Sequence, residues 1–252
     1  MTKIAISGIC GKMGRVLLKT ISGRTDCEVC CGIDIGEALE CPVPVYKSPA
    51  DMKEKPDVII DYSHPNSLDG LLEYAKATGT PIVLATTGYS EEQLAQIRKA
   101  SEEAALFSSF NMSLGMQLLI ALSKKAASVL GDQFDIEIIE KHHNQKIDAP
   151  SGTALMIANA LCDEFAPPKH LVYDRHSVRQ KRDISEIGMH SIRGGTIVGE
   201  HEVLFAGEDE CISITHTAAS KMVFAKGSVT AALFLIGKAP KLYDMTDIIG
   251  SV

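Results

Sequence analysis

The sequence predicts an α/β protein, with a Rossmann-like, doubly wound parallel sheet in one domain and a mixed or antiparallel sheet in a second, α+β domain. Over the first 110 residues short apolar runs alternate with helical patterns, which is typical of parallel strands joined by crossover helices. Between residues 187 and 217 strand-like stretches follow one another without a helix, which indicates antiparallel or mixed pairing. A chain of 252 residues is long enough for two modest cores.

The first domain is predicted from apolar runs that are short enough to be strands. The segments 66–79 and 90–104, between the later runs, carry apolar residues at helical spacing. Ser90, followed three positions later by Gln93, has the pattern of a helix N-cap. The predicted strands are 3–7, 28–33, 57–62, 81–86 and 105–109.

The pattern changes after residue 112. We expect an amphipathic helix over 113–130, a strand over 134–142, and a helix within 148–165 that has Pro150 in its first turn. The buried face of that last helix is predicted to carry Leu155, Ala158, Leu161 and Phe165.

The segment 220–240 is predicted to be a helix, apolar enough to be buried by packing back on the first domain. The expected domains are therefore 1–111 together with 221–252, and 112–220.

Composition excludes several classes of protein. The formal net charge of −7 argues against a broad surface for nucleic acid or for anionic membranes. No apolar run reaches membrane-spanning length and the opening stretch does not resemble a signal peptide, so we expect a cytoplasmic protein. Of seven cysteines, Cys27, Cys30 and Cys31 lie close together, but no second Cys or His pair stands at zinc-site spacing, so we expect buried thiols and no metal. The basic run 175–183 is interpreted as a solvated loop that helps to attract anions.

A glycine-rich turn after the first strand predicts a dinucleotide site. Gly8, Gly11 and Gly14 lie between a strand and the start of a helix, where backbone N–H groups and the helix dipole suit a pyrophosphate. The spacing is G-x-x-G-x-x-G, and a tight structural turn is the alternative interpretation. Asp34, at the end of the second strand, can accept hydrogen bonds from the adenosine ribose, although Asp is also an ordinary turn former. Ile35 stands where a basic residue would bind a 2′-phosphate, so NADH is expected to bind at least as well as NADPH.

The segment "EKHHNQKIDAPSGTA" at 140–154 combines groups for acid–base chemistry with an anion cradle. His142 titrates near neutrality, and Lys146 adds a positive charge or a proton. Ser151, Gly152 and Thr153 supply hydroxyls and N–H groups to a helix start, which suits a substrate carboxylate. The set fits hydride delivery to a carboxylate-bearing substrate, while a structural histidine pair or a metal site remain open alternatives.

Further polar residues follow in the predicted sheet of the second domain. For these we favour sheet pairing and subunit contacts over a place in the site: Arg193, Gly194, Gly195, Glu200 and His201.

The same segment closely resembles the E-x-H-H-x-x-K-x-D-x-P-S-G-T-A signature of the 4-hydroxy-tetrahydrodipicolinate reductase (dihydrodipicolinate reductase) family. The resemblance covers essentially the whole chain, and it includes "GICGKMG", "DYSHP", "ATTG", "SSFNMSLG" and "IRGGTIVGEHEVLFAG". It implies an NAD(P)H-dependent enzyme of the diaminopimelate route to lysine, with a nucleotide-binding domain (1–111 and 221–252), a domain for substrate binding and oligomerisation (112–220), and a homotetrameric assembly.

The resemblance also implies roles for individual residues. His142 and Lys146 resemble the acid–base and proton-donating residues, with His142 as first choice for protonating the ring after hydride addition. His143 joins Ser151, Gly152 and Thr153 in binding the carboxylates of the substrate. Further residues of this sequence match positions that contact the cofactor in the family. They are Gly8, Gly11, Lys12, Met13, Gly14, Asp34, Ala85, Thr86, Thr87, Ser109, Phe110, Asn111 and Met112.

The chain departs from the family pattern at Ala85, commonly glycine, at His64, often arginine, and at Ile35, basic in some members. Two rival functions remain. One is a nucleotide-binding redox sensor without turnover, which has no use for Lys146 beside His142. The other is a dehydrogenase for another small carboxylate, for which the chain offers no catalytic cysteine apart from Cys10 in the glycine turn.

Overall fold

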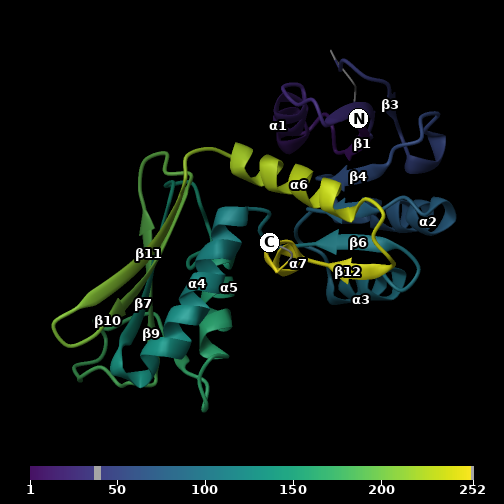
Figure 1. Ribbon diagram of the computed structural model, residues 1–252. Helices are drawn as coiled ribbons and strands as arrows, with labels where there is room; N and C mark the ends of the chain where they lie inside the picture. Colours follow the sequence, from purple (N-terminus) through teal and green to yellow (C-terminus); the bar gives the residue numbers. More distant parts are fainter. Residues whose placement is uncertain (37–40, 251–252) are drawn as a thin grey trace. The chain divides into compact units, whose positions relative to one another are not determined.

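The computed structural model describes residues 1–36 and 41–250 and divides the chain into two compact units. Unit 1 contains Met1–Leu114 and Lys221–Val252, and unit 2 contains Gly115–Ser220. Figure 1 shows the course of the chain, in which the last helices and the last strand belong with the N-terminal elements.

Unit 1 is built on a parallel sheet. In the described residues its strands lie in the order β12-β6-β5-β4-β1-β2-β3, and every neighbouring pair is parallel, which confirms the predicted doubly wound class. The strands β3 and β12 were not predicted, because runs of two and three residues carry no readable periodicity. The bounds are β1 (Thr2–Ser7), β2 (Cys27–Ile33), β3 (Val45–Tyr46), β4 (Val58–Asp61), β5 (Ile82–Leu84), β6 (Ala105–Ser108) and β12 (Lys241–Tyr243).

Helices cover both faces of this sheet. One core joins the sheet to α1 (Lys12–Ile21), α6 (Met222–Leu235) and α7 (Met245–Ile249), and the other joins it to α2 (Leu68–Thr78) and α3 (Glu91–Ala100). The helix α6 packs on α1, as the sequence predicted for 220–240, but it ends at Leu235, ahead of Gly237 with its positive φ of 72°. The predicted cap at Ser90 is confirmed, since its side chain accepts from the Gln93 N–H in a full capping box.

The strand order of unit 1 positions a ligand site. β1 and β4 are neighbours in the middle of the sheet, while the helices that follow them, α1 and α2, belong to opposite cores. Such a reversal opens a crevice at the carboxyl ends of the two strands, where open α/β sheets bind their ligands. The glycine turn after β1 and the segment 61–64 after β4 both lie at this point.

Unit 2 contains a mixed sheet with helices on one face. Its strands lie in the order β11-β10-β7-β9-β8, with β8, β9 and β7 mutually parallel and β10 antiparallel to its neighbours. Figure 1 shows α4 and α5 side by side, and both share one apolar core with the sheet. The bounds are α4 (Leu114–Leu130), β7 (Asp135–His142), α5 (Gly152–Cys162), β8 (His170–Val172), β9 (Glu186–Arg193), β10 (Gly199–Ala206) and β11 (Cys211–Ala218). Short 3-10 helices cover Gly131–Gln133 in this unit and Pro49–Asp51 and Pro65–Ser67 in unit 1.

The predicted buried face of α5 was right at Ala158 and Leu161 and wrong at the two ends of the helix. Ser151 is the N-cap, so Pro150 precedes the helix, and Phe165 lies beyond its end at Cys162. The buried positions are Ala154, Ile157, Ala158 and Leu161, whose i, i+3, i+4, i+7 spacing begins at residue 154, and Leu155 is only half-buried. Because apolar residues also flank this face, the sequence does not show which side of the helix is buried.

The basic run 175–183 is not simply a solvated loop. Arg182 Nη1 lies 2.7 Å from Asp135 Oδ1 and its Nε lies 3.0 Å from Glu137 Oε1, while Arg175 Nη1 lies 2.6 Å from Glu186 Oε2. These arginines neutralise carboxylates of β7 and β9, so their charges are engaged within unit 2 and are not free to attract anions.

Candidate active site

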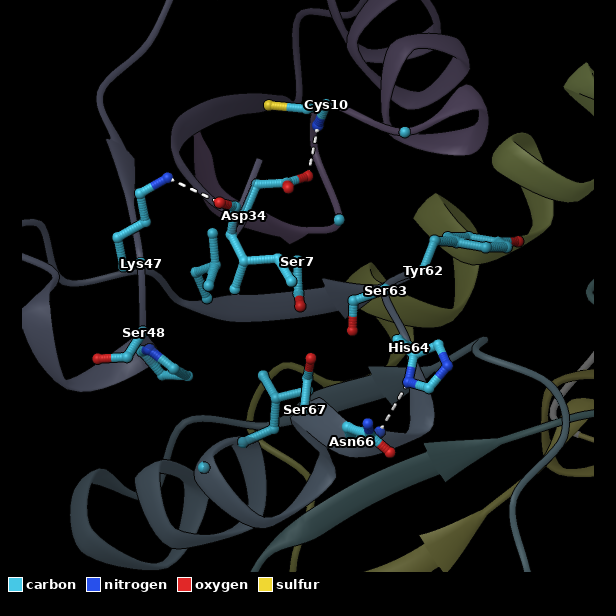
Figure 2. A pocket seen from close by; sticks show the side chains of 17 residues that line it. Ser7, Cys10, Asp34, Lys47, Ser48, Tyr62, Ser63, His64, Asn66 and Ser67 are labelled. Carbon is cyan, nitrogen blue, oxygen red and sulfur yellow. Dashed lines mark hydrogen bonds between the residues drawn. The ribbon is translucent and has the colours of Figure 1, made fainter. Parts of the chain in front are cut away.

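The main candidate site in unit 1 is a cavity of about 590 Å³ at the carboxyl ends of β1, β2 and β4. Figure 2 shows Lys47 beside Asp34, across the pocket from Ser63 and His64. The lining includes Gly8 and Gly11 from the glycine turn and Asp34 from the end of β2. The structure therefore brings together the glycines and the acidic residue that the sequence predicted for one nucleotide.

The glycine turn is a cradle that side chains would close. Gly8 has a φ of 79°, and a Cβ there would lie 2.5 Å from the carbonyl oxygen of Tyr62. A Cβ on Gly14 would lie 2.4 Å from the carbonyl oxygen of Gly8. Gly11 is the N-cap of α1 and offers no side chain to the helix N–H groups, which leaves them available to an anion. These residues fit the phosphates of a dinucleotide.

Asp34 is already oriented by the backbone. Its Oδ2 accepts from the Cys10 N–H at 2.9 Å and its Oδ1 accepts from the Gly36 N–H at 2.8 Å. Each carboxylate oxygen can accept a further bond, so ribose hydroxyls can be bound without displacing these contacts. Ile35 is 88% exposed, and its side chain offers no polar group to a phosphate.

Lys47 is a pocket residue that the sequence did not reveal. Its Nζ donates to the carbonyl oxygens of Ile35 at 2.9 Å and of Gly36 at 2.8 Å, which holds a positive charge beside Asp34. The sequence has Ile35 where a basic residue would bind a 2′-phosphate, whereas the structure provides a basic residue directly after β3, through the pairing of β3 with β2.

A second cavity, of about 390 Å³, lies after β4 and β5. Its lining includes the predicted residues Ala85, Thr86 and Thr87. The buried carboxylate of Asp61 fixes this region, because it accepts from Thr86 Oγ1 at 2.7 Å and from Ser63 Oγ at 2.5 Å. Burial, reinforced by the Asp61 charge, raises the pKa of the neighbouring Tyr89 hydroxyl, which therefore stays protonated.

The remaining predicted cofactor residues have varied surroundings. Met13 and Met112 pack against the apolar core of unit 1, while Lys12 is exposed and Phe110 is 79% exposed. Ser109 Oγ donates to the Asn111 carbonyl oxygen within the turn after β6. None of these six residues lines either of the two cavities described above.

In unit 2, His142 is held by a buried carboxylate. Its Nδ1 lies 2.5 Å from Glu140 Oε2, and both side chains project from the same face of β7 because they are two residues apart. Arg193 Nη1 and Nη2 donate to the two oxygens of Glu140 at 2.8 and 2.6 Å. Burial raises the pKa of Glu140, but bonds from Arg193, His142 and Ser191 outweigh it and hold the pKa at about 2. The carboxylate is therefore ionised at neutral pH.

The start of α5 lies next to this group. Ser151 is its N-cap and accepts from the Ala154 N–H at 3.1 Å, while its own N–H donates to Glu140 Oε1 at 3.1 Å. His201 Nε2 lies 3.1 Å from Ser151 Oγ, and its ring meets the His142 ring edge-on at 5.2 Å. Burial, followed by the neighbouring His142, lowers the pKa of His201 to about 4, so this ring is neutral at physiological pH. Gly152 and Thr153 form the first turn of the helix beside it.

Lys146 and His143 lie in or next to the loop between β7 and α5. Lys146 Nζ pairs with Asp148 Oδ1 at 2.8 Å, and this contact, the largest influence on Asp148, lowers the pKa of that carboxyl. The Nδ1 atom of His143 is buried and has no hydrogen-bond partner among the described residues. A ligand acceptor such as a carboxylate would satisfy it.

Sequence analysis missed Glu140 and assigned Arg193 and His201 mainly to sheet pairing and subunit contacts. The structure places all three around His142, so that assignment was incomplete. Glu140 could have been found, because it occupies a buried position in the alternation of β7 and shares a face with His142. In the described part of the chain, no group of three or more His, Cys, Asp or Glu side chains is arranged to hold a metal ion.

Comparison with known proteins decides the family. The model of the dihydrodipicolinate reductase N-terminus matches residues 2–112, and the model of the C-terminus matches residues 115–249. The chain belongs to the dihydrodipicolinate reductase family. The two family models meet at the boundary between β6 and α4, and together they cover nearly the whole chain.

Relatives and solved structures agree with membership of the dihydrodipicolinate reductase family. A 4-hydroxy-tetrahydrodipicolinate reductase from Caldanaerobacter subterraneus subsp. tengcongensis is 47% identical over 99% of this chain and 98% of its own length. One from Exiguobacterium sibiricum is 53% identical over 81% of each chain. The dipicolinate-bound dihydrodipicolinate reductase from Paenisporosarcina sp. TG-14 is 26% identical, with a TM-score of 0.78 over 97% of both chains. A probable dehydrogenase from Thermotoga maritima, 10% identical with a TM-score of 0.65 over 97% of this chain and 92% of its own, shares the fold alone.

Proposed function

We propose that this chain reduces 4-hydroxy-tetrahydrodipicolinate to tetrahydrodipicolinate with a reduced nicotinamide dinucleotide, in the diaminopimelate route to lysine. Family membership over both units supports the activity, and the observation that carries the site is His142, held by Glu140 beside the open start of α5. The dinucleotide supplies the hydride. Dipicolinate, which is bound in the Paenisporosarcina relative, has the same two-carboxylate character as the proposed substrate.

The residues of unit 2 suit a reaction that ends in protonation. In the proposal, His142 donates the proton to the reduced ring from its Nε2 atom, with Lys146 assisting through its positive charge. The N–H groups at Gly152 and Thr153 and the buried Nδ1 of His143 bind the carboxylates of the substrate, while Ser151 shapes this helix start as the N-cap whose own N–H donates to Glu140. These roles divide the site into a part that holds the substrate and a part that moves a proton.

The test is an assay of nicotinamide absorbance with freshly prepared substrate, using NADH and NADPH in parallel. Oxidation of either cofactor that depends on the substrate supports the proposal. Cofactor binding without turnover would instead support a redox sensor. A dehydrogenase that works through a cysteine nucleophile is disfavoured, because burial, together with the Asp34 carboxylate, raises the pKa of the Cys10 thiol.

The proposal extends to cofactor use: both NADH and NADPH serve, with NADH used at least as well. Asp34 supports ribose recognition in NADH, and Lys47 provides a charge for the 2′-phosphate of NADPH.

Replacing Asp34 by Ala is expected to weaken NADH more than NADPH. In NADH the carboxylate can accept from both ribose hydroxyls, whereas the 2′-phosphate of NADPH leaves only the 3′-hydroxyl. Losing a charge-assisted hydrogen bond costs about 2 kcal/mol, or roughly 30-fold in affinity. Titration of the variant with each cofactor, followed by fluorescence, measures the two losses separately. Because Asp34 also accepts from the Cys10 and Gly36 N–H groups, some loss for both cofactors is expected, but equal losses would refute the ribose contact.

Replacing Lys47 by Ala is expected to weaken NADPH by roughly 10-fold and to leave NADH nearly unchanged, because only NADPH carries a phosphate for this ammonium group. Lys53→Ala removes an exposed lysine of the same unit and is the control. The same titration measures the affinity of the variant for each cofactor. A loss of affinity restricted to NADH would show that Lys47 acts only by holding the loop 34–36.

The proposal also includes a homotetramer, taken from the family resemblance, and a cytoplasmic location, taken from the composition of the chain. The face of the unit 2 sheet opposite α4 and α5 carries Ile139, Leu204 and Ile192, which further copies of the chain could cover. All seven cysteines are free thiols, in keeping with a reducing compartment. In the described part of the chain, no helix combines the length and apolar character needed to cross a bilayer.

A further inference from the structure

Glu140 makes more contacts than a structural ion pair requires. Its side chain is fully buried in unit 2. Arg193 donates to both of its oxygens, and the remaining contacts reach the two parts of the proposed site: Oε2 lies 2.5 Å from His142 Nδ1, and Oε1 accepts from the Ser151 N–H at 3.1 Å. An ion pair with Arg193 alone would leave these last two contacts unexplained.

We propose that Glu140, clamped by Arg193, is the positioning residue of the site: it fixes the proton of His142 on Nδ1, presents Nε2 to the substrate, and anchors the start of α5. This inference rests on the proposed role of His142 as proton donor and deepens it.

The assignment of the proton follows from the chemistry of the partners. An ionised carboxylate can only accept hydrogen bonds, so the His142 nitrogen that faces it must carry a hydrogen. Nε2 is then the nitrogen that exchanges a proton with a ligand. A carboxylate that orients an imidazole in this way serves the same purpose in other acid–base enzymes.

The residue next to Nε2 is a glycine, within a side-chain environment that is otherwise buried. Gly199, at the start of β10, is its neighbour, and a Cβ at that position would lie 3.2 Å from Nε2. A side chain at residue 199 would therefore crowd the nitrogen that the proposal assigns to the substrate.

Arg193 links the carboxylate to the connecting loop. Besides Glu140, its Nη2 donates to the Asp148 carbonyl oxygen at 2.7 Å, and its Nη1 donates to the Ile192 carbonyl oxygen at 2.8 Å. The register of the sheet places it there, since Arg193 on β9 pairs with His142 on β7. The ion pair of Glu140 and Arg193 thus connects the His142 imidazole, the loop that carries Lys146, and the N-cap of α5.

The test compares Glu140→Gln and Glu140→Asp, with Glu202→Gln as control. Glu202 projects from the opposite face of the same sheet. In Glu140→Gln the amide oxygen is expected at the Oε1 position, because its two partners, Arg193 Nη2 and the Ser151 N–H, can only donate. The amide N–H₂ then occupies the Oε2 position, where it faces His142 Nδ1 and requires it to accept. We expect the neutral ring to change from the Nδ1–H form to the Nε2–H form, observed by ¹⁵N NMR of histidine-labelled protein. We further expect kcat to fall about 10²-fold with a smaller change in KM.

Glu140→Asp keeps an acceptor-only group, so it should retain the Nδ1–H form and recover part of kcat, while Glu202→Gln should change neither quantity. A wild-type ring protonated on Nε2, or an unchanged tautomer and kcat in Glu140→Gln, would overturn the proposal. If Glu140→Gln does not fold, loss of the Nδ1–H form in folded Glu140→Asp would overturn it and retention would support it. The NMR result does not depend on turnover, so an inactive wild type would refute the proposed function and leave the positioning role to be judged by the tautomer.

Discussion

Replacement of His142 by Ala is expected to lower kcat for the proposed reduction by about 10²-fold or more, because a positioned proton donor contributes at least that factor. Lys146→Ala is expected to cause a loss of similar size, since it removes the cation that assists the same proton transfer. Both are measured by steady-state assays with NADH and with NADPH. Cofactor affinity should be unchanged in both variants, because the nucleotide residues of the proposal all lie in unit 1.

His176→Ala is the matched control for His142→Ala. His176 is an exposed histidine of the same unit, outside the group formed by Glu140, Arg193 and His201, and its removal should leave kcat within about two-fold. Rates that remain intact in His142→Ala and Lys146→Ala would eliminate the acid–base roles. A loss restricted to KM would instead assign these side chains to substrate binding.

Replacement of Gly227 by Ala is expected to reduce the free energy of unfolding by about 3 kcal/mol. A Cβ at this position of α6 would lie 1.6 Å from the carbonyl oxygen of Met112, a backbone atom that cannot rotate away. Alanine is favoured over glycine inside a helix by less than about 1 kcal/mol, so the clash outweighs the gain in helix propensity. Urea unfolding of the purified variant measures the difference.

Gly23→Ala provides the comparison, because a Cβ there would meet no atom within 4 Å and the residue has no positive φ. Its stability should change by less than about 0.5 kcal/mol. Equal unfolding free energies for Gly227→Ala and wild type would mean that α6 shifts freely along the sheet, contrary to its burial at Ala225, Val229 and Ala232.

The sequence predicted the elements that have strong periodicity. Five strands of unit 1, its helices α2 and α3, the return of α6 to it, and the mixed sheet of unit 2 follow from apolar spacing. The full buried face of α5, the short helix α7 and the strands β3 and β12 did not, because a uniformly apolar helix and such short segments lack a readable pattern.

The candidate site also contains residues that the sequence could reveal and residues that it could not. His142, Lys146 and Ser151 are near one another in the chain, so a local motif reveals them. Arg193 reaches Glu140 only through the parallel register of β9 with β7, and His201 lies opposite Glu140 only through the pairing of β10. Lys47 likewise reaches the pocket beside Asp34 only because β3 pairs with β2. Contacts between distant segments require a sheet register, which periodicity alone does not supply.

The return of the chain to its first unit has a consequence for biosynthesis. Residues 221–252 supply α6, α7 and the edge strand β12 to unit 1, while unit 2 is made of the uninterrupted segment 115–220. A ribosome therefore releases every part of unit 2 before these last pieces of unit 1 emerge. We infer that unit 2 completes folding first, and that nascent unit 1 keeps the apolar face around Ile6, Ile60 and Phe107 uncovered until α6 leaves the ribosome.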